Sequence, residues 1–122
     1  MFTKVEEIVF RYNGDGTKDV GVKFEYSDLT LLDIVYMFTK KYDVKYIDVS
    51  IDDEYGYGAG RHSLDYFFSM YDDLSMIEYV SFDLDVLNAR VVVYPDNQTV
   101  CLNYRNVGET PVVELDQILL VD

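Results

Sequence analysis

Two stretches of this sequence pair carboxylates at spacings that acid–base catalysis or metal binding could use. Asp48 and Asp52 are four residues apart, and Asp83 and Asp85 are two apart. Either pair could act as an acid–base couple, or hold a hard cation such as Mg²⁺ or Ca²⁺ through oxygen ligands. Against both, residues 52–56 lack the spacing of an EF-hand loop, and open carboxylates on a sheet face lack the burial that tunes a catalytic pKa. We therefore predict no catalytic residue and no metal site.

The other reactive residue types are isolated in the sequence. His62 is the only histidine and stands before Ser63, where we expect a helix to begin. Cys101 is the only cysteine, which excludes an internal disulfide, and its setting predicts a half-buried structural thiol. The alternating glycines of residues 56–60 match neither a P-loop nor a dinucleotide fingerprint. These observations predict a protein that is not an enzyme and takes no cofactor.

The negative charge of the chain is unevenly distributed. The 122 residues carry a formal net charge of −13, and residues 43–85 hold eleven acidic side chains against two basic ones, a net of −9. Such surplus charge repels nucleic acid and anionic membranes and attracts cationic partners. We therefore expect a basic protein partner, with no direct binding to nucleic acid or to a membrane.

Hydrophobic patterning predicts the elements that position these residues. Alternation over 5–12 and 19–26, around a glycine-rich turn, indicates a β-hairpin in which Ile8, Phe10 and Tyr12 share one face. A helix should run from Ser27 or Asp28 to about residue 42, and a third strand should cover 44–52. We expect a loop over 53–60, a second helix from Ser63 to about residue 74 and a strand over 77–86. Strands over 89–94 and 99–105 should form a hairpin, and 110–121 could be helix or strand.

This element order predicts a single α+β domain over residues 1–122. We expect an antiparallel-rich sheet of about six strands in ββαβαβββ order, with two or three helices packed mainly on one face. The opposite face of the sheet should then be solvated. No secretory signal and no apolar run long enough to cross a membrane is visible in the sequence, which predicts a cytoplasmic protein.

Two strands should present acidic and tyrosine side chains on that open face. Because side chains alternate along a strand, each strand places its set on one side, and fold stability alone gives no reason to place like charges opposite each other. The following loop adds further carboxylates and phenols. The predicted partner-binding residues are Tyr46, Asp48, Asp52, Asp53, Glu54, Tyr55, Tyr57, Tyr79, Asp83 and Asp85. A competing acidic surface is the exposed side of the second helix, with Asp65, Asp72 and Asp73.

A small acidic domain with this surface suggests a stoichiometric inhibitor that occludes a basic partner. In size, charge and tyrosine-bearing surface it resembles the immunity proteins of bacterial toxin systems, which cover toxins such as nucleases. It also resembles phage-encoded anti-defence inhibitors of the anti-CRISPR and DNA-mimic types. No motif carries either resemblance, and no family residue is transferred. The interpretation from a different class is a structural or accessory module whose acidity serves only solubility.

Overall fold

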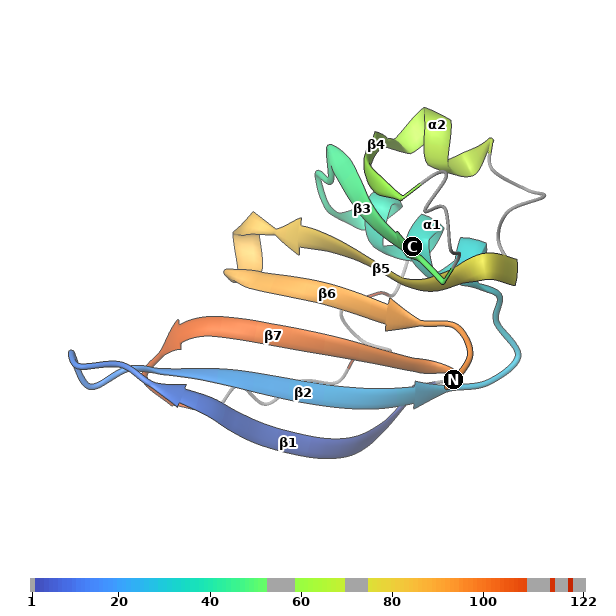
Figure 1. Cartoon of the computed structure of the whole chain (residues 1–122). Helices are drawn as coiled ribbons and strands as arrows, with labels where there is room; N and C mark the ends of the chain where they lie inside the picture. The colour runs from blue at the N-terminus through green and yellow to red at the C-terminus, as the bar shows by residue number, and fades with distance from the viewer. Residues whose placement is uncertain (1, 53–58, 70–74, 110–114, 116–118, 120–122) are drawn as a thin grey trace.

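The computed structural model describes residues 2–52, 59–69, 75–109, 115 and 119. Within them the chain forms β1 (Phe2–Tyr12), β2 (Lys18–Tyr26), α1 (Leu31–Lys41), β3 (Tyr46–Ile51), β4 (Gly60–Ser63) and α2 (Leu64–Phe68). These are followed by β5 (Ile77–Leu84), the 3-10 turn η2 (Asp85–Leu87), β6 (Ala89–Tyr94) and β7 (Thr99–Val107). The seven described strands form one sheet in the order β1-β2-β7-β6-β5-β3-β4, and every neighbouring pair is antiparallel (Figure 1). The α+β class is thus confirmed, with one strand more than expected.

One face of the sheet is covered by α1, which lies behind it in Figure 1. The N-cap of this helix is Thr30, not the predicted Ser27 or Asp28, because Thr30 and Asp33 form a capping box. Its buried residues include Ile34 and Phe38, and the Phe38 ring contacts that of Phe82 on β5 at 5.5 Å between centroids. Helix packing against the apolar side of the strands therefore builds the core.

The C-terminal segment also contributes to this core. Leu115 and Leu119 are buried in the same hydrophobic cluster as α1, and the Leu119 N–H donates to the Leu115 carbonyl, as in a turn of α-helix. The remaining residues of 110–122 lie outside the described part, so the choice between helix and strand there stays a prediction. Among the described residues, no helix is both long and apolar enough to cross a membrane.

Three element boundaries differ from the sequence prediction. Residues 60–63, which join the predicted loop to the predicted start of the second helix, form β4 and pair with β3, so that Arg61 lies opposite Asp48. Ser63 caps α2 as expected, but the described helix ends at Phe68, and 70–74 lie outside the described residues. Strand β5 ends at Leu84, and Val86, predicted to point inward, is 82% exposed in η2. The αL conformation of Asn88 makes this tight connection to β6 possible.

The first strand also behaves differently from its pattern. Ile8, Phe10 and Tyr12 do not share one face as predicted, because the irregularity between Val9 and Arg11 places Ile8 opposite Gly21 and Tyr12 opposite Lys18, on different faces of β2, and all three side chains are exposed at this edge of the sheet. Two bulges interrupt the pairing of β1 with β2, one between Lys4 and Glu6 and one between Val9 and Arg11. An apolar alternation therefore identified the strand correctly without identifying its buried side.

Candidate functional site

The predicted acidic face is partly assembled by the pairing of β3 with β5. Asp48 lies opposite Ser81, and Ser50 lies opposite Tyr79, so the two strands are direct neighbours. Because they are antiparallel, Tyr46, Asp48 and Asp83 lie toward one end of the pair. Asp52 and Tyr79 lie toward the other end, where the Tyr79 ring packs on Tyr94 at 5.6 Å. The structure therefore brings only part of the predicted set together, and Asp53, Glu54, Tyr55 and Tyr57 lie outside the described residues.

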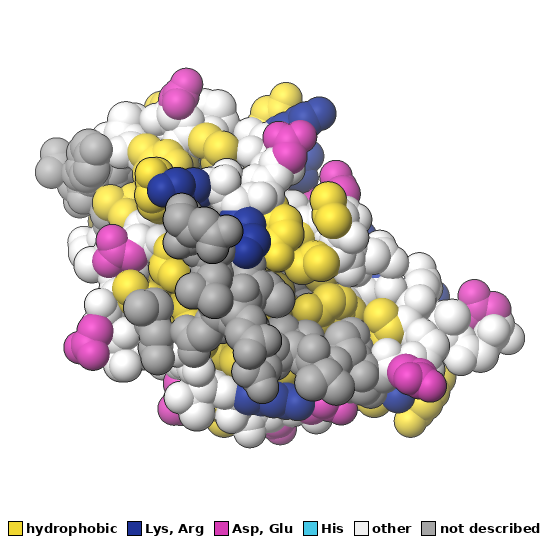
Figure 2. Space-filling model, turned by 180° about the vertical axis from the view of Figure 1, so that it is seen from behind, with side chains coloured by type: hydrophobic (Ala, Val, Ile, Leu, Met, Phe, Trp, Pro, Cys, Tyr) yellow, Lys and Arg dark blue, Asp and Glu magenta, His cyan; other side chains and the backbone are white. Residues whose placement is uncertain are grey.

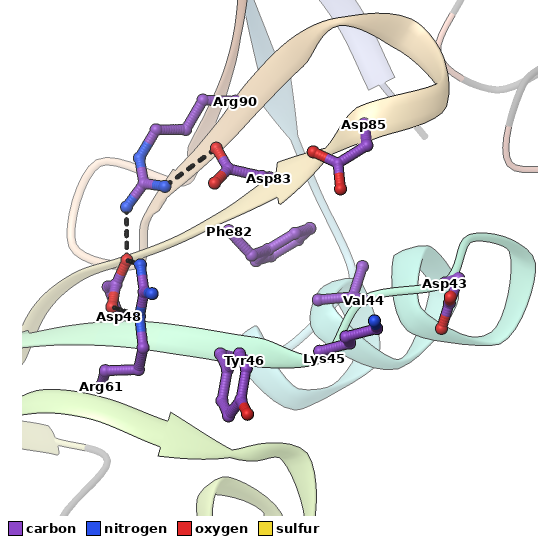
Figure 3. Close-up of a pocket in the computed structure, with 10 residues that line it drawn as sticks. All are labelled: Asp43, Val44, Lys45, Tyr46, Asp48, Arg61, Phe82, Asp83, Asp85 and Arg90. Atoms are coloured by element: carbon purple, nitrogen blue, oxygen red, sulfur yellow. Dashed lines mark hydrogen bonds and ion pairs between the residues drawn. The ribbon is translucent and has the colours of Figure 1, made fainter.

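A hollow of about 200 Å³ marks the first of these ends, and we call it the β3–β5 pocket (Figure 3). At about 30 Å³ of liquid per water molecule, it has room for roughly half a dozen waters or for one long side chain. Its position follows from the chain, because the loop after α1, the start of β3 and the end of β5 converge there. The pocket is lined by Asp43, Val44, Lys45, Tyr46, Asp48, Arg61, Phe82, Asp83, Asp85 and Arg90.

Asp48 on β3 is held by one arginine from the neighbouring strand β4 and by another from β6, two strands away. The Arg61 Nε and Nη2 atoms donate to its two carboxylate oxygens at 2.9 and 3.2 Å, and the Arg90 Nη2 donates to Oδ2 at 2.6 Å. These hydrogen bonds, those from Arg61 foremost, lower the pKa of Asp48 to about 2. The carboxylate is therefore ionised and already neutralised within the protein at neutral pH.

The same arginine connects Asp48 to Asp83. The Arg90 Nη1 atom donates to Asp83 at 3.0 Å, and Nη2 also donates to the hydroxyl of buried Ser81 at 2.7 Å. Arg105 reaches Asp83 from β7 at 3.7 Å. The expectation that the carboxylates of β3 and β5 form a surface of uncompensated charge is therefore wrong for Asp48 and Asp83, because arginines of three strands, β4, β6 and β7, pair with them.

Two carboxylates of the pocket remain without such partners. The carboxylate groups of Asp43 and Asp85 make no hydrogen bond or ion pair with the other described residues, and Figure 3 shows both set apart from the arginines that bind Asp48 and Asp83. Tyr46 is 55% exposed, with Arg61 over its ring at 5.8 Å from the centroid. Asp85 keeps its predicted place near the site although it lies in η2 and not on a strand. Asp43 was missed, because it follows the helix and stands outside any strand pattern.

The charge of the pocket as a whole is close to balanced. Four carboxylates and three cations line it, and the third cation, Lys45, makes no ion pair with the described residues. The described residues hold sixteen acidic and ten basic side chains, a net of −6, so seven acidic residues belong to 53–58, 70–74 and 110–122. On the face seen from behind, the described carboxylates stand apart around the outline and form no single patch (Figure 2). On this face, the described residues therefore do not form the concentrated acidic surface expected from the sequence.

The described residues bring together neither a group of metal ligands nor the histidine and the cysteine of the chain. They contain no group of three or more histidine, cysteine, aspartate or glutamate side chains that could hold a metal ion. Cys101 on β7 and His62 on β4 are four strands apart, roughly 19 Å at the usual strand spacing, too far for a nucleophile–base pair. Burial raises the pKa of the Cys101 thiol, which keeps it protonated and unreactive near neutral pH.

Comparison with known proteins adds no family. No family model matches the chain, and neither the curated proteins nor the solved structures contain a match. The functional argument therefore depends on the geometry of the β3–β5 pocket.

Proposed function

We propose that this protein is a non-enzymatic inhibitor that binds a basic protein partner stoichiometrically, and that the partner is a bacterial toxin against which it provides immunity. The observation that carries the proposal is the β3–β5 pocket, whose lining includes the exposed Tyr46 and the carboxylates of Asp43 and Asp85, which pair with no other described residue. Carboxylates and a phenol ring that line one pocket fit the guanidinium or ammonium group of a partner.

In this proposal the pocket receives one arginine or lysine of the partner. The cation pairs with Asp43 and Asp85, its aliphatic stem packs toward Phe82 at the base of the pocket, and Tyr46 closes one side. Desolvated charge pairs and buried tyrosines are typical of the residues that dominate binding energy in protein interfaces. If that cation normally holds phosphate in a nuclease, its capture occludes the toxin's own site.

The paired residues have a different role from the one that the sequence suggested. Asp48, Arg61, Arg90 and Asp83 link β4, β3, β5 and β6 through charged hydrogen bonds, which fixes the floor and wall of the pocket. A surface that is rigid before binding loses less conformational freedom in the complex. We therefore assign Asp48 and Asp83 to positioning the pocket and not to contacting the partner.

The same ion pairs favour a second candidate, an accessory module of a larger assembly. A protein whose main carboxylates are neutralised by its own arginines needs no cationic partner to satisfy them, and the remaining surface charge would then serve solubility. Phage anti-defence inhibition is a third role that uses the same basic partner chemistry. The two inhibitor roles differ in the partner that is captured.

Capture of the partner distinguishes these candidates. The protein, immobilised through its C-terminus, is exposed to extract from its source organism, and the retained protein is identified by mass spectrometry. We expect one basic protein, retained in equimolar amount, whose association rate falls steeply as salt is raised, because steering by charge is screened. Addition of the free protein should abolish the toxic activity of the captured species. Retention that is insensitive to salt, or no retention at all, would favour the accessory role and contradict inhibition.

A further inference from the structure

The unpaired charges of the β3–β5 pocket are of both signs. The carboxylates of Asp43 and Asp85 and the ammonium group of Lys45 make no hydrogen bond or ion pair with the described residues. The other four charged side chains of the lining are bound to one another by the ion pairs given above. The pocket therefore offers a ligand two negative groups and one positive group.

These three groups come from two segments of the chain. Asp43 and Lys45 are exposed on either side of the buried Val44, in the connection from α1 to β3, and Asp85 is exposed at the start of η2 (Figure 3). Val44 and Phe82 supply buried apolar surface to the same lining. A ligand that meets all three charges can therefore also cover an apolar area.

The size of the pocket limits the ligand to a small molecule. Pockets that take drug-sized ligands usually measure ~300–1,000 Å³, and this hollow measures about 200 Å³. A space of this size corresponds to a single amino acid and not to a folded segment of a peptide. The ligand must therefore carry its charges within one small molecule.

We propose that the β3–β5 pocket binds a free basic amino acid, L-arginine or L-lysine. Such a molecule carries a side-chain cation, an α-ammonium group and an α-carboxylate, which complement the free charges of the pocket one for one. The two cations pair with Asp43 and Asp85, and the α-carboxylate pairs with Lys45. The aliphatic stem of the ligand packs against Val44 and Phe82.

Other classes of small ligand leave some of these charges unpaired. An anion finds only Lys45, because Arg61 and Arg90 already bind carboxylates. A ligand that carries only positive charge leaves Lys45 unpaired close to the bound cation, and like charges at short range are unfavourable. The presence of a free ammonium group in an otherwise acidic site therefore favours a ligand that also has a carboxylate.

This inference uses the pocket of the proposed function but does not require a protein partner. A side chain inserted by a partner presents its cation alone, whereas a free amino acid also engages Lys45. If both ligands bind, they compete for Asp43 and Asp85. The amino acid can therefore be tested on the protein alone.

The test compares L-arginine with agmatine, its analogue without the α-carboxylate, by titration of the ¹⁵N-labelled protein at constant ionic strength. Agmatine carries more net positive charge, so general attraction to a chain of net charge −13 would favour it. We expect instead that L-arginine binds about threefold to fivefold more tightly, the effect of one exposed ion pair. The amide shifts should be concentrated in residues 43–48 and 82–85.

The variant Lys45→Gln identifies the origin of this preference. It should remove the advantage of L-arginine, so that agmatine binds at least as tightly. The control Lys40→Gln makes the same change in charge on α1, outside the pocket lining, and should keep the advantage. The double variant D43N/D85N should weaken L-arginine binding about tenfold, because two ion pairs are lost. The amide spectrum of each variant shows directly whether the fold is intact.

Three results would overturn the inference. These are the absence of saturable shifts with L-arginine, agmatine binding as tightly as L-arginine, and a preference for L-arginine that Lys45→Gln leaves unchanged. If L-arginine fails to bind while a captured protein partner depends on Asp43 and Asp85, only this inference is wrong. If L-arginine binds and no partner is captured, the proposed function is wrong and the amino-acid site stands.

Discussion

The two edges of the sheet differ in how far their side chains are paired within the protein. Near the β4 edge, Arg61 and Arg90 bind carboxylates at distances of 2.6–3.2 Å, and Arg61 also covers the Tyr46 ring. At the β1 edge, apolar side chains are exposed and Phe10 lies over a glycine. Groups that the chain satisfies internally contribute to its rigidity. Among the described residues, the carboxylates of Asp43 and Asp85 pair with no other side chain, and this is where we propose that the partner binds.

Among the ion pairs near the β4 edge, those of Arg90 should contribute most to stability. Its guanidinium donates to Asp48, Ser81 and Asp83, and its side chain is only 26% exposed. Arg90→Met should lower the free energy of unfolding by about 2 kcal/mol, because partly buried carboxylate and hydroxyl groups lose charged donors. Urea denaturation measures the change.

Arg61→Met is the matched control for this variant. Arg61 binds the same carboxylate but is 61% exposed, so its loss should lower the free energy of unfolding less than the loss of Arg90 does. If the two variants lost equal stability, burial would not be what distinguishes the two ion pairs.

The contribution of the Asp48 ion pairs should also appear, as a smaller effect, in the dependence of the free energy of unfolding on acid pH. The pKa of Asp48 is lowered to about 2 in the folded protein, against about 3.9 when unfolded. A lowered folded-state pKa contributes stability that is present above about pH 4 and is lost as the pH falls toward 2. The free energy of unfolding should therefore fall less steeply between these pH values for Asp48→Asn than for the unmodified protein.

The matching control is Asp19→Asn. Hydrogen bonds from the Asn106 backbone and the Asn13 side chain lower the pKa of Asp19 as well, at the far hairpin. Its replacement should remove the contribution of Asp19 to the fall in unfolding free energy at low pH. The contribution of Asp48 should remain. Parallel curves for Asp48→Asn and the unmodified protein would show that Asp48 is not held as we describe.

Much of the fold could be predicted because period-two alternation is local. It located β2, β3, β5, β6 and β7 to within a few residues, and the lysines near the end of α1 and the serine before α2 marked helix ends. Strand β4 was missed because four residues after a glycine-rich stretch carry no clear alternation. The exposed side of β1 was not predicted either, because which strand becomes the edge depends on long-range pairing.

The sequence predicted the side chains that each strand places on one face of the sheet. It did not predict which side chains of other strands lie next to them. The pattern placed Tyr46, Asp48 and Asp83 on one face, and the pairing of β3 with β5 brought them together. It did not reveal the arginines that neutralise them. Arg90 could have been found, because the short connection between β5 and β6 places it opposite Asp83. Arg61 could not, because its position depends on β4.

The central claim is that Asp43 and Asp85 of the β3–β5 pocket bind a cationic group of the partner. It is tested most directly by measuring the affinity of the captured partner for the double variant D43N/D85N. The control is D28N/D96N, which removes the same charge at exposed positions near the opposite end of β6. We predict that D43N/D85N weakens binding about tenfold or more, whereas D28N/D96N changes it little. Equal losses for the two variants would show that net charge alone attracts the partner, and the assigned pocket would be wrong.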